Sequence, residues 1–167
     1  MAGQFDDLFE ANAAYVEKFS LGGLEPVARR GLALVTCMDS RIEPLSALGL
    51  EPGDAKILRN AGGRVTDDTL RTLVLAVYLL EVDRVLIMPH TQCKMASVSS
   101  DDEVHDFIRA NYGVDTRSLE FHTVTDQRAA LQRDLERIRH HPLLPDDLPV
   151  AGAVYDVDSG TVTPLNA

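Results

Sequence analysis

Short apolar runs that alternate with longer helical patterns are the feature that most restricts the fold of this chain. Residues 31–37, GLALVTC, show no polar alternation, which is typical of a strand covered on both faces. Similar runs occur at 55–59, 84–89, 119–124 and 150–157, and helical patterns lie between them at 67–81, 101–111 and 126–140. Strands that alternate with helices indicate βαβ units. We therefore predict an α/β fold with a mostly parallel central sheet flanked by helices.

A single domain over residues 1–167 accounts for this pattern. A chain of 167 residues can bury a core without disulfides, and no repeat, low-complexity segment or linker divides it. The domain is expected to begin with an amphipathic helix at about 3–19, whose apolar face would pack on a partner subunit. The pattern at 67–81 is apolar on nearly every side, which also indicates a dimer interface.

The charge and hydropathy of the chain limit its partners. Its formal net charge of −10 disfavours broad contact with nucleic acid or with an anionic membrane surface. No apolar stretch reaches the roughly 18 residues of a membrane span, and the N-terminal residues lack the pattern of a secretory signal or transit peptide. We therefore expect a cytoplasmic protein that acts on a small molecule and has no nucleic-acid or membrane partner.

Two cysteines and a histidine follow predicted strands. Cys37 ends the first strand, and His90 and Cys93 follow the strand predicted at 84–89. Functional groups gather beyond the carboxyl ends of strands in open α/β sheets, and without a sign of export the two cysteines are not expected to form a disulfide. Two thiolates and an imidazole suit zinc and leave a fourth position for water or substrate. The sequence predicts a catalytic zinc site at these three residues.

Other interpretations of the same residues stay open. Each of the three taken alone is more often a buried structural residue. A nucleophilic Cys37, with Arg41 as anion binder and His90 as base, is a sharper rival. However, three residues separate Cys37 from Arg41, whereas the phosphate-cradling loop of cysteine phosphatases has five. The RNAGG turn at 59–63 could bring backbone N–H groups near the site, but it lacks the spacing of a dinucleotide-binding turn.

The pattern C-x-D-x-R followed by H-x-x-C resembles the β-class carbonic anhydrases, and CMDSR, RNAGG and HTxCxM resemble their compact bacterial members. The resemblance implies zinc on Cys37, His90 and Cys93, with Asp39 and Arg41 as a dyad beside the fourth zinc position. It implies reversible hydration of carbon dioxide to bicarbonate and a proton, and a homodimer or a dimer of dimers. Arg41 would hold Asp39 as a carboxylate off the metal.

Two positions depart from the family pattern. The family commonly has HTDCGM, whereas this chain has Gln92 in place of the Asp and Lys94 in place of the Gly. We expect Lys94 and Gly62 to line the substrate pocket. Because Lys94 would alter that pocket, a hydrolase of carbonyl sulfide or carbon disulfide on the same zinc site is the second hypothesis. A zinc-binding relative without catalysis is the third. Asp39 and Arg41 argue against it, because a purely structural site needs neither.

Overall fold

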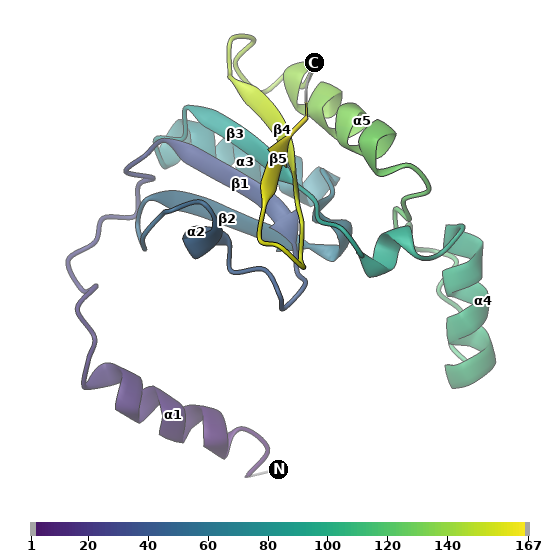
Figure 1. Cartoon of the computed structure of the whole chain (residues 1–167), viewed down its shortest axis with the longest axis horizontal. Helices are drawn as coiled ribbons and strands as arrows, with labels where there is room; N and C mark the ends of the chain where they lie inside the picture. The colour runs from purple at the N-terminus through teal and green to yellow at the C-terminus, as the bar shows by residue number, and fades with distance from the viewer. Residues whose placement is uncertain (1–2, 166–167) are drawn as a thin grey trace.

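The computed structural model describes residues 3–165, which form a five-stranded sheet in the order β2-β1-β3-β4-β5 (Figure 1). The strands are β1 (Leu32–Cys37), β2 (Ala55–Asn60), β3 (Arg84–Met88), β4 (Val150–Tyr155) and β5 (Val162–Pro164). The helices are α1 (Asp6–Val16), α2 (Pro44–Ala47), α3 (Asp67–Leu79), α4 (Asp101–Tyr112) and α5 (Gln127–Arg139). All neighbouring strands are parallel except β4 and β5. The predicted α/β fold with a mostly parallel sheet is confirmed.

Strand β1 lies at the centre of the core, between β2 and β3. Val35 belongs to the cluster that α3 and α5 cover, which includes Leu73 and Leu135. Its neighbour Leu34 points to the opposite face and packs against Met88 in a second cluster. Burial on both faces explains why the strand is apolar without alternation. The second cluster contains the two cysteines, so the site is built into the core.

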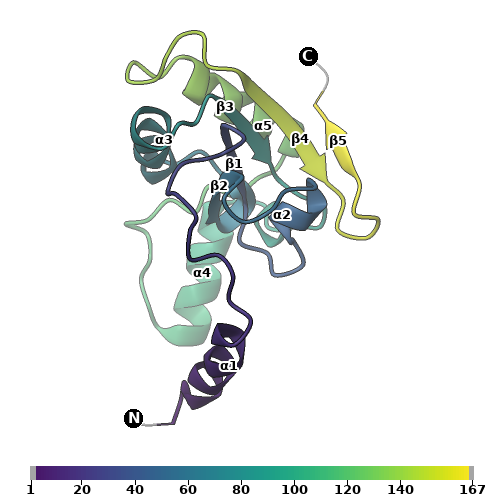
Figure 2. The ribbon, with the colours of Figure 1, turned by 90° about the vertical axis from the view of Figure 1, so that its left-hand side faces the viewer.

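Helices α1 and α4 extend away from the sheet (Figures 1 and 2). Helix α1 begins and ends inside the predicted 3–19, and none of its residues is buried. Asp6 and Asp7 occupy its first turn, where negative charge favours the helix dipole. The apolar side chains of α1 are therefore exposed and do not pack on the sheet, and Phe9 is 70% exposed. Within residues 3–165, no helix is both long and apolar enough to cross a membrane.

The strand predicted at 119–124 is wrong. In place of a strand, the backbone N–H groups of Phe121, His122 and Thr123 donate to the Asp101 carboxylate, at 2.6, 3.2 and 2.9 Å. A side chain at the start of α4 thus takes the donors that a neighbouring strand would need. The sequence also failed to predict α2 and β5, which have only four and three residues.

Candidate metal centre

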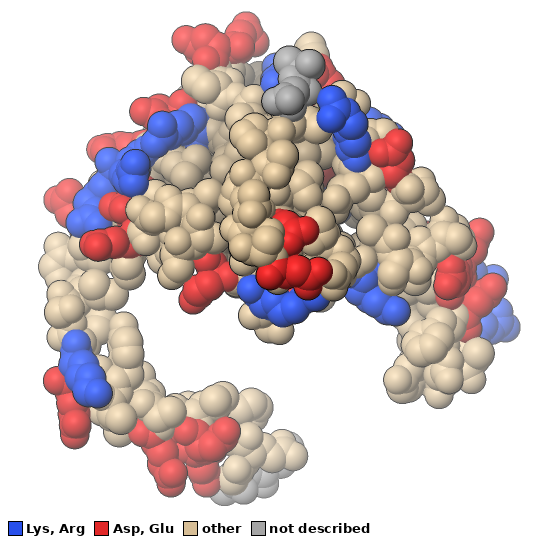
Figure 3. All heavy atoms as spheres, in the orientation of Figure 1, with Lys and Arg blue, Asp and Glu red and all other residues tan. Residues whose placement is uncertain are grey.

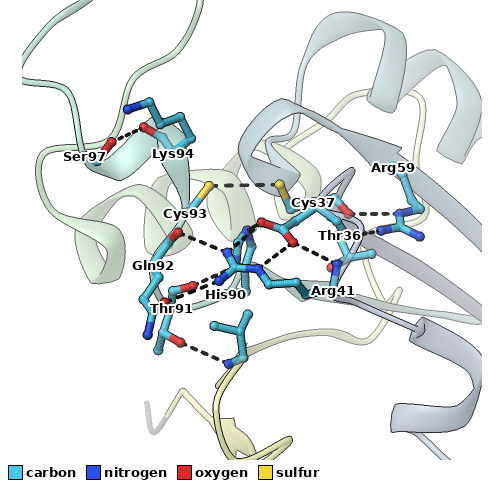
Figure 4. Close-up of polar contacts among 12 residues, drawn as sticks. Thr36, Cys37, Arg41, Arg59, His90, Thr91, Gln92, Cys93, Lys94 and Ser97 are labelled. Carbon is cyan, nitrogen blue, oxygen red and sulfur yellow. Dashed lines mark hydrogen bonds and ion pairs between the residues drawn. The ribbon is translucent and has the colours of Figure 1, made fainter.

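Cys37, His90 and Cys93 lie together at the carboxyl end of the sheet (Figure 4). Cys37 is the last residue of β1, and the other two residues follow β3. Their three ligand atoms all lie within 4.8 Å of one another, and the two sulfur atoms are 4.0 Å apart. All three side chains are buried, His90 completely. The fold therefore brings the three residues that the sequence singled out to one point.

The geometry of this group fits zinc. In a tetrahedral site with Zn–S bonds of about 2.3 Å, two sulfur ligands are separated by about 3.8 Å, close to the distance observed here. The His90 Nδ1 lies 2.8 Å from the carbonyl oxygen of Thr91, which accepts only, so Nδ1 carries the ring proton. The Nε2 atom is buried and has no hydrogen-bond partner among the residues described. A buried lone pair aimed at two sulfurs is a ligand set for a soft or borderline metal ion.

The two thiols interact strongly with each other. Their hydrogen bond lowers the pKa of Cys37 and raises the pKa of Cys93, so the pair loses its first proton readily and keeps the second. Backbone N–H groups of Asp39 and Gly62 also face the Cys37 sulfur and lower its pKa. Gly62 belongs to the RNAGG turn, so its contact with Cys37 agrees with the expectation that this turn brings backbone donors to the site. A bound divalent ion would replace the remaining proton, because cysteine binds metals as the thiolate.

The RNAGG turn also holds the backbone of the site. A side chain at Gly63 would place its Cβ 3.0 Å from the backbone nitrogen of Cys37, and the φ of Gly63 is +64°, so glycine is needed here. Arg59 donates from Nε to the carbonyl oxygen of Cys37 at 2.9 Å and from Nη2 to that of Asp39 at 2.6 Å. Sequence reasoning did not assign this role to Arg59, although its place in the motif was a usable signal.

Gln127 is a second residue that sequence reasoning missed. Its Nε2 donates to the carbonyl oxygen of His90 at 2.7 Å, from the first turn of α5. No motif surrounds Gln127, and 37 residues separate it from His90, so no sequence signal could have found it. The contact fixes the backbone of a residue whose ring lies beside the two cysteine sulfurs.

Asp39 and Arg41 form a two-pronged ion pair beside the three ligands. The Arg41 Nε donates to Oδ1 at 2.9 Å, and Nη2 donates to Oδ2 at 2.8 Å. The Arg41 side chain, and next its backbone N–H, hold the pKa of Asp39 well below its usual range, so Asp39 is a carboxylate. Its Oδ2 lies 3.8 Å from the His90 Nε2. The pair thus borders the position that a fourth metal ligand would occupy.

The two residues expected in the substrate pocket lie in different surroundings. Gly62 borders a cavity of about 10 Å³ that Cys93 and Gln127 also line, at the lower limit of space for one water. Lys94 is exposed, and its ammonium points away from the cysteine sulfurs (Figure 4). The structure therefore brings Gly62 to the metal centre but not the charge of Lys94.

A mostly parallel sheet with a buried Cys-His-Cys group at its carboxyl edge and a carboxylate–guanidinium pair beside it defines an α/β protein with a group that could hold a metal ion. The sequence profile of the carbonic anhydrase family matches residues 32–162. The chain is 32% identical to β-carbonic anhydrase 1 of Mycobacterium tuberculosis over 156 residues, which cover 93% of each chain. It therefore belongs to the β-carbonic anhydrase family of lyase-type enzymes.

Two further comparisons agree with this assignment and extend it. The crystal structure of a carbonic anhydrase from Streptococcus mutans superposes with a TM-score of 0.92, at 37% identity over 99% of each chain. A carbon disulfide hydrolase from Acidithiobacillus thiooxidans is 28% identical and covers 96% of this chain and 88% of its own. The relatives thus include proteins named for two different substrates.

Proposed function

We propose that this protein is a zinc-dependent carbonic anhydrase, which interconverts carbon dioxide with bicarbonate and a proton. Cys37, His90 and Cys93 would hold the zinc. The single observation that carries the proposal is the buried Nε2 of His90, which has no hydrogen-bond partner among the described residues and faces two sulfurs 4.0 Å apart. Two carbonic anhydrases are 37% and 32% identical to this chain, and the carbon disulfide hydrolase from Acidithiobacillus thiooxidans is 28% identical.

Asp39 and Arg41 would supply the groups that act on the reacting water. When bound, zinc supplies a Lewis acid that lowers the pKa of water and makes a nucleophile at neutral pH. Asp39 is ionised, and its Oδ2 faces the ligand set, so it can accept a hydrogen bond from the water and orient a lone pair toward carbon dioxide. Arg41 keeps that carboxylate turned toward itself. The side chain of Asp39 is 20% exposed, which gives the released proton a route to solvent.

Hydrolysis of carbonyl sulfide or carbon disulfide is the second candidate function. The observation that favours it is the similarity to a carbon disulfide hydrolase over nearly the whole chain. These substrates are also linear and electrophilic at carbon, so the same ligands and the same dyad would serve. A side-by-side assay decides between the candidates: carbon dioxide hydration by stopped-flow and sulfide release from carbonyl sulfide and carbon disulfide.

We propose a homodimer as the smallest assembly, and a dimer of dimers is compatible with the same surfaces. Helix α1 buries none of its own residues, and Phe9 and Val16 are exposed on it. Helix α3 also exposes Tyr78 and Leu79, by 61% and 69%. Figure 3 shows a face that is hollowed between α1 and α4. A second copy that filled this hollow would cover apolar area that monomers rarely leave in water.

Light scattering tests the assembly. The wild-type protein should have at least twice the mass of the 18.3 kDa chain, whereas Phe9→Glu should shift it toward the monomer mass. Glu10→Gln, an exposed change on the same helix, is the control. A wild-type monomer would refute the dimer. A cytoplasmic location stays a prediction.

The main experiment measures zinc content and carbon dioxide hydration on the same sample. The wild-type protein should hold about one zinc per chain, and His90→Ala should lose both zinc and activity. His140→Ala is the matched control, because His140 is an exposed histidine that contacts Glu136 at the end of α5. A fully active protein without metal, or a zinc-loaded wild type without hydration activity, would overturn the proposed function.

A further inference from the structure

Asp39–Arg41 and Asp115–Arg117 are both pairs of an aspartate with the arginine two residues later. In both Asp39–Arg41 and Asp115–Arg117, the arginine Nε donates to Oδ1 at 2.9 Å, and Nη2 donates to Oδ2. The backbone N–H of the arginine also donates to Oδ1, at 2.9 and 3.2 Å. The arginine side chains are 45% and 60% exposed. The fork therefore forms within each of these two segments, whereas in the D-x-R segment at 126–128 the Asp126 Oδ1 accepts from the backbone N–H of Ala129 at 3.0 Å and caps α5. Exposed pairs of this kind stabilise a protein little.

Arg41 differs from Arg117 at the other edge of its guanidinium. Its Nη1 donates to the Gln92 Oε1 and its Nη2 to the Gln92 carbonyl oxygen, both at 3.3 Å (Figure 4). Within residues 3–165, the hydrogen bonds of Arg117 go to Asp115 alone. Arg41 is thus held from two sides, by Asp39 and by Gln92, whereas Arg117 is held from one side by Asp115.

Gln92 in turn contacts the turn between β4 and β5. Its Nε2 donates to the Asp158 Oδ2 at 2.6 Å. The amide orientation follows from the partners, because Arg41 can only donate and the Asp158 carboxylate can only accept. A side chain that carries both an acceptor and a donor can join this cation to this anion. An aspartate or glutamate at position 92 has no donor for Asp158, which gives a physical reason for the Gln in place of the family's Asp.

The turn that carries Asp158 is ordered before it meets Gln92. The Asp156 Oδ1 accepts from the backbone N–H of Asp158 at 3.1 Å and from that of Ser159 at 2.8 Å. Thr91, the residue before Gln92, accepts at its Oγ1 from the backbone N–H of Val157 at 3.1 Å. The turn is therefore tied to the same loop whose glutamine it holds, so Asp158 offers a fixed anchor rather than a mobile charge.

We propose that Gln92 and Asp158 are positioning residues of the metal centre, which hold the Arg41 guanidinium in place and so keep Asp39 turned away from the metal. The inference rests on the proposed function for its catalytic consequence, while the position of Arg41 is measurable without activity. Asp39 needs little movement to reach the metal, because its Oδ2 is 3.8 Å from a ligand atom. Loss of the second set of contacts leaves only the local fork to prevent that movement.

The test compares the two arginines within one molecule. In NMR spectra of the zinc-loaded protein, the Nε–H proton of Arg41 should exchange with water at least about fivefold more slowly than that of Arg117. Arg41→Lys and Arg117→Lys assign the two signals. In Gln92→Ala, the Arg41 exchange rate should rise most of the way to that of Arg117, because only the backbone carbonyl oxygen of residue 92 remains as an acceptor for Nη2. Asp158→Asn should raise the rate less. Asp146→Asn, an exposed aspartate in another turn, is the control for Asp158→Asn.

The kinetic arm uses a double-mutant cycle. We expect kcat for carbon dioxide hydration to fall about 10-fold in Gln92→Ala and less in Asp158→Asn, at unchanged zinc content, because partners that orient site residues typically contribute 10- to 100-fold. The double variant should be no worse than Gln92→Ala, because Asp158 acts through Gln92. Additive losses, or an Arg41 signal that Gln92→Ala leaves unchanged, would overturn the inference. If Gln92→Ala does not fold, Asp158→Asn decides alone, because it alters only an exposed turn.

The two proposals fail in different ways. A wild type with zinc but no hydration activity removes the proposed function, and the exchange rate of Arg41 still decides the positioning role. An active wild type in which Arg41 and Arg117 exchange equally fast refutes the positioning role alone.

Discussion

The Oδ2 atom of Asp39 lies 3.8 Å from the Nε2 atom of His90, and Arg41 occupies the same oxygen with a hydrogen bond of 2.8 Å. With a metal ion on Cys37, His90 and Cys93, this carboxylate oxygen would have two competing positions, on the guanidinium and on the ion. The choice between them would decide whether the fourth position on the ion is free for water.

Replacing Asp39 by Asn should leave zinc bound and reduce hydration activity about 10- to 100-fold. The three ligands are unchanged, while the charge that orients the reacting water is lost. Metal analysis and stopped-flow assays on one sample measure both quantities. Asp115→Asn, in the second D-x-R fork, is the control and should behave as wild type. Full activity in Asp39→Asn would remove the dyad from the mechanism.

Arg41→Ala should reduce activity most at low pH. Arg41 lowers the pKa of Asp39, so removal of the Arg41 side chain returns that pKa toward about 3.9. Asp39 therefore stays ionised near neutrality. The effect therefore comes from a freed carboxylate that competes for zinc. As the pH rises, hydroxide displaces it and activity should partly recover. A pH–rate profile against Arg117→Ala measures this, and an equal loss at every pH would contradict the switch.

Removal of zinc by a chelator should destabilise the protein. Without a metal, the buried Nε2 of His90 has no hydrogen-bond partner within residues 3–165, and a buried unsatisfied group costs about 1–3 kcal/mol. Thermal unfolding should therefore occur at a lower temperature after chelation and be restored by added zinc. Cys93→Ser should bind little zinc, and its Tm should respond to neither treatment. An unchanged Tm in the chelated wild type would indicate that these residues do not hold the metal.

The charge of Lys94 should have no effect on catalysis. Its side chain is exposed, and its ammonium points away from the two sulfurs. Lys94→Gly and Lys94→Met should give pH–rate profiles and anion inhibition that superimpose on those of the wild type. A raised apparent pKa of activity in both variants would show instead that the ammonium acts on the site. A changed pH–rate profile in Lys94→Gly but not in Lys94→Met would indicate an effect of side-chain volume.

Asp101→Ala should lower the free energy of unfolding by about 1–3 kcal/mol, since it leaves the backbone donors of residues 121–123 without their acceptor. Asp102→Ala, the next residue in the same first turn, is the matched control. Burial alone would raise the pKa of Asp101, but the donors of Thr123, Phe121 and His122 outweigh it and lower the pKa to about 2. The stabilisation is therefore complete above about pH 4 and is lost as the pH falls toward 2. Urea titrations at pH 7 and pH 3 measure both effects, and a difference from Asp102→Ala that grows in acid would contradict the account.

The sequence by itself determined the local features of this protein. Hydrophobic periodicity reports which faces of a segment are buried, so it predicted strands β1 to β4 and helices α3 to α5 within a few residues. The D-x-R fork is a contact between residues two positions apart, and it forms at Asp39 and again at Asp115. Residue type, motif spacing and the position after predicted strands singled out Cys37, His90 and Cys93 as candidate metal ligands.

Only the tertiary structure decided which of these features act together. Cys37 and Cys93 are 56 residues apart and meet because β1 and β3 are neighbours in the sheet. Asp115 and Arg117 form the same fork at a distance in sequence from Cys37, His90 and Cys93, and Asp115 alone holds the Arg117 guanidinium within residues 3–165. The prediction of a strand at 119–124 is wrong because a distant side chain supplies the acceptor. The backbone N–H groups there donate to Asp101 and not to a neighbouring strand. Gln92 meets Asp158 across 66 residues through a turn that no periodicity describes. Polar contacts at such separations depend on where the packed core places two loops, and a linear pattern does not carry that information.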